Sequence, residues 1–81
     1  MSVTIVMKLD LKGLSCPLPI IKTAKAMKSI YPGEYIEVFA TDPGSVPDFK
    51  AWAQTTGNPL VESDVQDGVF HFILRKKGGL A

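Results

Sequence analysis

The sequence is poor in the residues that build disulfides and metal centres, because its 81 residues include one cysteine, Cys16, and one histidine, His71. A single cysteine cannot form an internal disulfide or a Cys-x-x-Cys redox pair. One thiol and one imidazole also fall short of the several ligands of a zinc site, so we expect no bound metal. His71 is distant from Cys16 in sequence and no third group accompanies it, which argues against a Cys-His nucleophile. If Cys16 is reactive, these absences leave a thiol that accepts a group and passes it on.

The sequence also lacks a strong net charge and long apolar runs. Its formal net charge is +1, whereas a nucleic-acid binder is usually strongly basic or carries a basic stripe, so we expect no direct nucleic-acid ligand. No apolar run approaches the ~20 residues of a membrane span, and the first residues show no leader pattern, so we expect no membrane association. We predict a cytoplasmic protein of one domain, residues 1–81, in which residues 77–81 form a frayed tail.

Two hydrophobic periods alternate along the chain. Period two predicts strands over residues 5–11, 35–40, 60–65 and 69–75. Helical spacing predicts one helix that runs from the Cys16 region to a stop at Tyr31-Pro32-Gly33, with its apolar stripe on Ile20, Ala24, Met27 and Tyr31 and widened by Ile21 and Ile30. A second helix, over residues 45–56, would begin with a capping box at Ser45-Val46-Pro47-Asp48.

The order βαβαββ predicts an α+β fold, a two-layer α/β sandwich. Right-handed crossovers place both helices on one face of a four-stranded mixed sheet, and Asp67-Gly68 signals a hairpin between the last two strands. The other face would carry Tyr35, Phe39, His71 and Ile73. It is either a surface for a partner or for self-association, or a mildly apolar sheet face with no such role.

Cys16 lies in Gly13-Leu14-Ser15-Cys16-Pro17-Leu18-Pro19, between a predicted strand and a predicted helix. The two prolines are tolerated in a first helical turn, which makes Ser15 or Cys16 the N-cap. A helix N-terminus favours an anion, so we expect the pKa of the thiol to be lowered, with Lys12 and Lys22 as the nearest cations in the sequence. Structural and reactive roles for Cys16 both stay open, and the proline context favours the reactive one.

Other candidate site residues each have a simpler interpretation. Asp42 and Asp48 follow or precede elements whose ends meet at one edge of the sheet, so they could border Cys16. We prefer to interpret Asp42 as a turn residue and Asp48 as a helix cap. Basic residues could contact a partner or be solvated charges: Lys22, Lys25 and Lys28 on the first helix, and Arg75, Lys76 and Lys77 in the tail.

Residues 9–19, which contain Cys16-Pro17-Leu18-Pro19, resemble the N-terminal signature of the TusA/SirA family of sulfur carriers, whose hallmark is Cys-Pro-x-Pro. Three further segments are similar to family motifs, and the resemblance covers about residues 8–79. These segments are Tyr31-Pro32-Gly33-Glu34, Thr41-Asp42-Pro43-Gly44 with Asp48-Phe49, and Arg75-Lys76-Lys77-Gly78.

This resemblance implies a cytoplasmic sulfurtransferase that accepts sulfane sulfur as a persulfide on Cys16 and needs no separate cofactor. Its implied partners are sulfur donor and acceptor proteins such as cysteine desulfurases, rhodaneses or DsrE-type proteins, in tRNA thiolation, cofactor sulfuration or sulfur oxidation. Thr41 stands where many members have an acid, and Leu18 stands where the tRNA-pathway members often have one, which favours sulfur oxidation or an orphan role. Two other functions stay open: a regulatory module that binds through the open sheet face or the basic tail, and a thiol-disulfide regulator.

Overall fold

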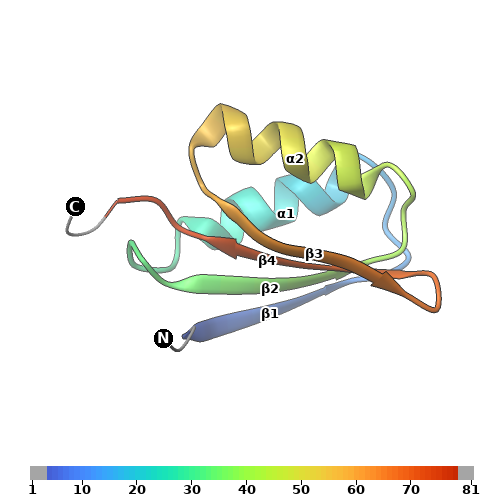
Figure 1. Cartoon of the computed structure of the whole chain (residues 1–81), viewed down its shortest axis with the longest axis horizontal. Coiled ribbons are helices and arrows are strands. Elements are labelled where there is room, and N and C mark those ends of the chain that lie inside the picture. Colours follow the sequence, from blue (N-terminus) through green and yellow to red (C-terminus); the bar gives the residue numbers. More distant parts are fainter. Residues whose placement is uncertain (1–3, 79–81) are drawn as a thin grey trace.

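The computed structural model describes residues 4–78, which form one sheet with two helices packed on the same face (Figure 1). Alternation of apolar residues predicted the bounds of three strands, and the remaining strand, which begins at Leu60, is one residue longer than predicted. The elements are β1 (Ile5–Leu11), α1 (Leu18–Met27), β2 (Tyr35–Ala40), α2 (Ser45–Thr56), β3 (Leu60–Gln66) and β4 (Val69–Arg75).

The sheet is mixed, with strand order β1-β2-β4-β3. β1 and β2 pair in parallel, whereas β4 is antiparallel to both of its neighbours. The predicted α+β two-layer architecture is therefore confirmed. Because each parallel strand leads into a helix, the loops before α1 and α2 lie at the same end of the sheet (Figure 1).

The core lies between the sheet and the helices. Ile36, Val38 and Ala40 of β2 point toward the helices and are fully buried, as the period-two pattern predicts. Phe49 of α2 and Phe72 of β4 are also fully buried, with ring centroids 4.6 Å apart. Burial of one such side chain contributes about 1.5–3 kcal/mol, so this pair is a main source of the adhesion between α2 and the sheet.

Helix α1 is shorter than predicted and buries a different stripe. It ends at Met27 with Lys28 as its C-cap, four residues before Tyr31, and its buried residues are Pro19, Thr23 and Met27. Tyr31 is 77% exposed, because it lies beyond the helix in a turn whose backbone N–H donates to Glu34 Oε1 at 2.8 Å. The predicted place of Tyr31 on the apolar stripe of this helix was therefore wrong.

The turn between β3 and β4 is the hairpin that Asp67-Gly68 predicts. Asp67 has φ 52° and Gly68 has φ 77°. Two consecutive residues with positive φ form the type I′ pattern, whose twist matches that of the flanking strands. The hairpin places β3 at one edge of the sheet, where most of its residues are exposed.

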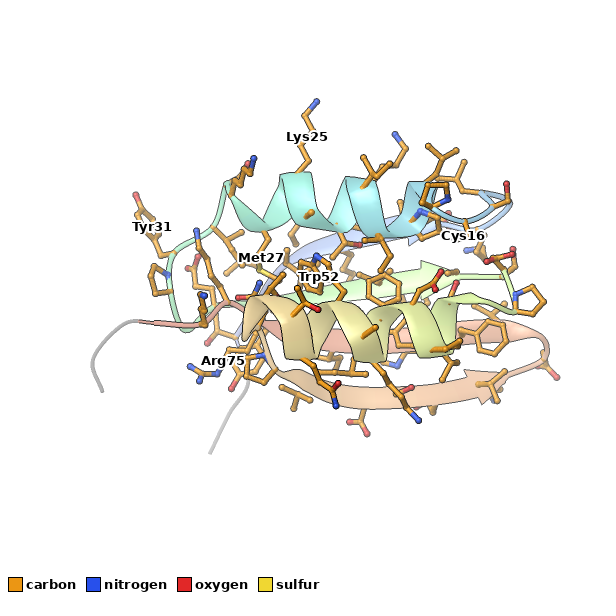
Figure 2. All side chains as sticks on the ribbon, turned by 90° about the horizontal axis from the view of Figure 1, so that it is seen from above. Cys16, Lys25, Met27, Tyr31, Trp52 and Arg75 are labelled. Atoms are coloured by element: carbon orange, nitrogen blue, oxygen red, sulfur yellow. The ribbon has the colours of Figure 1, made fainter. Side chains whose placement is uncertain are left out.

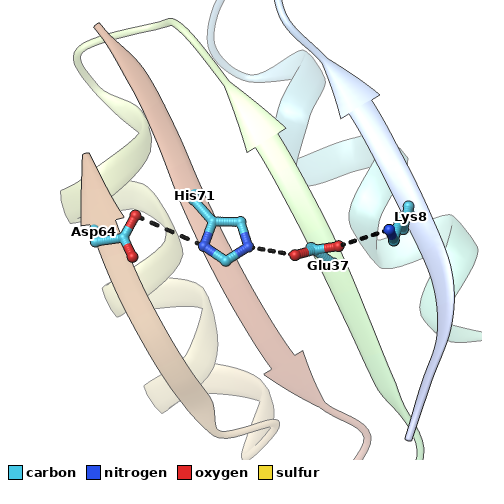
Figure 3. Close-up of polar contacts among 4 residues, drawn as sticks. All are labelled: Lys8, Glu37, Asp64 and His71. Atoms are coloured by element: carbon cyan, nitrogen blue, oxygen red, sulfur yellow. Dashed lines mark hydrogen bonds and ion pairs between the residues drawn. The ribbon is translucent and has the colours of Figure 1, made fainter. Parts of the chain in front are cut away.

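The sheet face opposite the helices is crossed by a row of polar side chains, one from each strand (Figure 3). Lys8 Nζ lies 3.7 Å from Glu37 Oε1, and His71 Nε2 lies 2.6 Å from Glu37 Oε2. Asp64 Oδ1 lies 3.7 Å from His71 Nδ1, and the Phe39 ring stacks on His71 with centroids 5.1 Å apart. A second chain on this face would have to cover these charges, which favours a solvent-facing sheet over a docking surface.

The C-terminal tail is only partly described. The predicted frayed segment covers residues 77–81, of which 79–81 lie outside the described residues. The backbone N–H of Lys77 donates to Asn58 Oδ1 at 2.9 Å. Neither of the two helices within residues 4–78 has the length and apolar character to cross a membrane.

Candidate functional site

Cys16 lies in the loop between β1 and α1, and its side chain is exposed to solvent (Figure 2). Two backbone hydrogen bonds between residues three positions apart form turns in this loop. They run from Leu14 N–H to the Leu11 carbonyl at 3.2 Å and from Leu18 N–H to the Ser15 carbonyl at 2.9 Å. The Cys16–Pro17 peptide bond is cis. A solvent-exposed thiol in an ordered loop can be reached by another molecule, unlike a thiol that fills the core.

The helix begins later than the sequence suggested. Pro17, not Ser15 or Cys16, is the N-cap of α1, and no side chain caps this end. Pro19 occupies the second helical position, where the missing N–H costs no helical hydrogen bond. Cys16 is therefore one residue outside the N-cap, and its sulfur is not a capping group.

The thiol of Cys16 points instead toward the first turn of α2. Its Sγ donates a hydrogen bond to Asp48 Oδ2 at 2.9 Å. The predicted capping box is absent, because Gly44 is the N-cap and no side-chain hydrogen bond caps α2. The hydroxyl of Ser45 is buried without a partner among the described residues. The preferred interpretation of Asp48 as a helix cap was therefore wrong, and the alternative, that it borders Cys16, describes its position.

This contact reverses the expected electrostatics of the thiol. The pKa of Cys16 is raised above its ordinary value, first by the hydrogen bond to Asp48, then by desolvation and by the negative charges of Asp48 and Asp42. A hydrogen bond donated by the neutral thiol and two nearby carboxylates all oppose the formation of a thiolate. The prediction of a lowered pKa was wrong because it considered the helix terminus and two lysines of the sequence but not the carboxylates of Asp48 and Asp42.

Asp42 approaches the same place from the loop after β2. Its backbone carbonyl accepts a hydrogen bond from Ser45 N–H at 3.0 Å, so its interpretation as a turn residue is confirmed. Its carboxylate also faces Gly44: a Cβ at that position would lie 3.1 Å from Asp42 Oδ2 and 3.7 Å from Asp48 Oδ2. Gly44 has a helical φ of −75°, so here the missing side chain provides space between two carboxylates and not backbone freedom.

Neither predicted cation contributes to the shifted pKa of the thiol. Lys12 Nζ lies 3.1 Å from Asp10 Oδ1 and 5.7 Å from the centre of the Phe39 ring. Lys22 lines a shallow groove of about 350 Å³ between α1 and the edge strand β1, together with Lys25. Among the residues that the structure describes, the charged groups that shift the pKa of Cys16 are carboxylates only.

Arg75 lies at the other end of the molecule from Cys16 (Figure 2), and Lys76 follows it directly in the chain. Lys76 Nζ donates to the carbonyl of Ile30 at 2.7 Å, just beyond the C-terminus of α1. A cation at this end satisfies a free carbonyl and complements the helix dipole. The structure therefore does not bring the two tail residues to the thiol.

Two apolar side chains near Cys16 are exposed on α1. Leu18 is 42% exposed and Ile21 is 54% exposed. Ile21 was expected to widen the buried stripe, which was wrong, because it lies three residues after Leu18 on the outer face of the helix. With Lys22 they form a mixed apolar and basic surface beside the thiol.

The chain belongs to the TusA sulfurtransferase family, because the sequence model of the family described as Sulfurtransferase TusA matches residues 7–76. It is 49% identical over 69 residues to the Sulfur carrier protein TusA of Allochromatium vinosum, which covers 85% of this chain and 91% of that protein. It is 46% identical over 78 residues to the Putative sulfur carrier protein YrkF of Bacillus subtilis, which covers 96% of this chain and 41% of that longer protein.

The fold agrees with this family. The crystal structure of a SirA-like protein from Desulfitobacterium hafniense matches with a TM-score of 0.79 and 23% identity, over 90% of this chain and 100% of that chain. The resemblance drawn from the Cys-Pro-Leu-Pro segment is therefore confirmed, and a sulfur carrier role for this family member follows. Such a role involves proteins that supply sulfur and proteins that receive it.

Proposed function

We propose that this protein carries sulfane sulfur as a persulfide on Cys16 between a donor protein and an acceptor protein. The observation that carries the proposal is the exposed side chain of Cys16 in its Cys-Pro-Leu-Pro segment, at the one thiol of the sequence. The family membership of the chain and its similarity to proteins named as sulfur carriers support the same role. No second thiol in the sequence competes for the persulfide by forming an internal disulfide.

The reaction transfers one sulfur atom without net oxidation or reduction. The Cys16 sulfur, as a thiolate, attacks the terminal sulfur of a donor persulfide, R–S–SH. The S–S bond of the donor breaks, a new S–S bond forms on Cys16 Sγ, and the donor leaves as a thiol that takes up the proton lost by Cys16. Delivery is the same exchange with an acceptor thiol in the place of Cys16.

The persulfide itself stores the sulfur, so the proposal includes no other cofactor. The proposed donors are cysteine desulfurases, rhodaneses or DsrE-like proteins, and the proposed uses are tRNA thiolation, cofactor sulfuration or sulfur oxidation. We place the relay in the cytoplasm, where thiols stay reduced. The exposed surface of Leu18, Ile21 and Lys22 beside the thiol offers apolar area and positive charge for docking a protein partner.

The proposal is tested by intact-mass measurement after incubation with glutathione persulfide. We expect the protein to gain whole sulfur atoms and to lose them when a reducing agent is added. The matched variant Cys16→Ser keeps the size of the side chain and should gain none. The proposal is abandoned if the unmodified protein gains no sulfur, or if Cys16→Ser retains the adducts.

A further inference from the structure

The hydrogen bond between Cys16 and Asp48 can exist in only one of the two chemical states of a sulfur carrier. In the free thiol, Sγ carries a proton and donates it to Asp48 Oδ2 at 2.9 Å. In a persulfide, Sγ is bonded to carbon and to the second sulfur and has no proton to donate. The terminal sulfur lies about 2 Å further out, the length of an S–S bond. Loading therefore removes this contact.

The second consequence of loading is electrostatic. Asp48 and Asp42 both act on the sulfur of Cys16 with negative charge. When the terminal sulfur of a persulfide ionises, its charge adds to theirs, and like charges in proximity disfavour the charged form. Within residues 4–78, no salt bridge pairs a cation with either of these carboxylates. Both effects favour the unloaded thiol over the loaded persulfide.

From this we propose that Asp48 is a positioning residue that weakens the hold of Cys16 on its sulfur and so favours delivery over retention. The inference rests on the proposed function, because it concerns the persulfide on that same cysteine. A carrier needs such a bias: a sulfur atom that is bound too tightly is not passed to the acceptor thiol. Asp48 is suited to this role because the first turn of α2 holds its carboxylate in place, and that turn is anchored in the core by Phe49.

The role is specific to Asp48 and not shared equally with Asp42. Of these two carboxylates, only that of Asp48 is hydrogen-bonded to the thiol in the described part of the chain, and its effect on Cys16 exceeds that of Asp42. Gly44 leaves room for both side chains, since a Cβ there would lie 3.1 Å from Asp42 Oδ2. We therefore expect the sulfur affinity to respond most strongly at position 48.

The test is the equilibrium of sulfur exchange with glutathione, Cys16–SH + GS–SH ⇌ Cys16–S–SH + GSH, at neutral pH. The loaded fraction is read by intact mass at several ratios of glutathione persulfide to glutathione. For Asp48→Ala we expect the equilibrium constant to rise about fivefold, which corresponds to the net contribution of about 1 kcal/mol of a typical hydrogen bond. The equilibrium constant of Asp48→Asn, which retains an acceptor but no charge, should also rise. Glu62→Gln, which removes the same charge from exposed β3, should match the unmodified protein.

The equilibrium constant separates this role from a structural one. A loosened loop that speeds or slows exchange equally in both directions leaves the equilibrium constant unchanged, whereas loss of the Asp48 effect raises it. A constant for Asp48→Ala that is equal to or below that of the unmodified protein overturns the inference. Failure of the proposed function looks different: the unmodified protein would then gain no sulfur at any ratio. Urea unfolding of Asp48→Ala and Asp48→Asn verifies that each variant is folded under the conditions of the exchange.

Discussion

The backbone N–H of Gly13 donates a hydrogen bond to the hydroxyl oxygen of Thr41 at 2.9 Å, and this contact joins the loop after β1 to the loop after β2. The two residues are 28 positions apart in the chain. One loop carries Cys16 and the other leads to Asp48, so the bond holds together the two parts of the site. The Thr41 hydroxyl oxygen has lone pairs to accept this hydrogen bond, so the contact needs no acidic side chain at this position.

Thr41→Val should therefore loosen the site with little effect on the core. The variant keeps the shape of the side chain and removes the acceptor, so we expect a loss of about 0.5–1.5 kcal/mol in the free energy of unfolding, measured in urea. The alkylation midpoint of Cys16 should move toward that of an ordinary thiol, because the contact with Asp48 becomes less frequent. Thr41→Ser, which keeps the oxygen, should behave as the unmodified protein. An unchanged midpoint in Thr41→Val would show that the loops hold each other without this bond.

The raised pKa of Cys16 gives a second prediction, on pH dependence. The rate of alkylation by iodoacetamide should have its midpoint above the value of about 8.5 of a free thiol. Asp48→Asn should lower that midpoint, because it removes one negative charge beside the thiol and leaves only a neutral amide oxygen as the hydrogen-bond acceptor. A midpoint below 8.5 in the unmodified protein would instead support the effect of the helix terminus.

The same shift has a defined sign for stability. Because the folded protein binds the thiol proton more tightly than the unfolded chain does, this contribution is present below the unfolded pKa. It is lost as the pH rises through the folded pKa. Cys16→Ser, which has no thiol to ionise, should lose less stability between neutral and alkaline pH than the unmodified protein in urea unfolding at several pH values.

The strands could be predicted from the sequence because each depends on local alternation. In β2, Ile36, Val38 and Ala40 face the core as predicted, and the two-residue hairpin follows from Asp67-Gly68 alone. The ends of α1 were less accurate, because prolines near Cys16 and Tyr31 fit several boundaries. Local patterns say where a strand runs, but they do not say where a helix with several possible ends begins.

The electrostatics of the site could not be predicted in this way. Cys16 and Asp48 are 32 residues apart, and no local pattern connects a loop thiol to the first turn of a later helix. Parallel β1 and β2 did place both loops at one end of the sheet, so proximity was predictable. The donor–acceptor pairing, which decides the sign of the pKa shift, depends on side-chain directions that only the folded chain defines.

A fourth prediction concerns the tail. Lys76→Ala should lower the free energy of unfolding by about 0.5–1.5 kcal/mol, since the carbonyl of Ile30 loses the ammonium that donates to it. Sulfur loading from glutathione persulfide should be unchanged, because Lys76 binds the Ile30 carbonyl and its neighbour Arg75 lies away from Cys16 (Figure 2). Lys77→Ala, a change of the adjacent exposed lysine, controls for the lost charge. Slower loading in Lys76→Ala with intact stability would require a role for the tail at the thiol.

The last prediction tests the core that fixes α2, and with it Asp48. Phe49 is fully buried against Phe72, and it follows Asp48 directly. Phe49→Ala should lower the free energy of unfolding by about 3–5 kcal/mol through lost burial and a cavity, a large part of the stability of a small domain. Phe49→Leu fills more of the space and should cost less. In folded Phe49→Leu the alkylation midpoint of Cys16 should fall if core packing sets the position of Asp48. If stability falls while the midpoint stays unchanged, the loop contacts alone position Asp48 against the thiol.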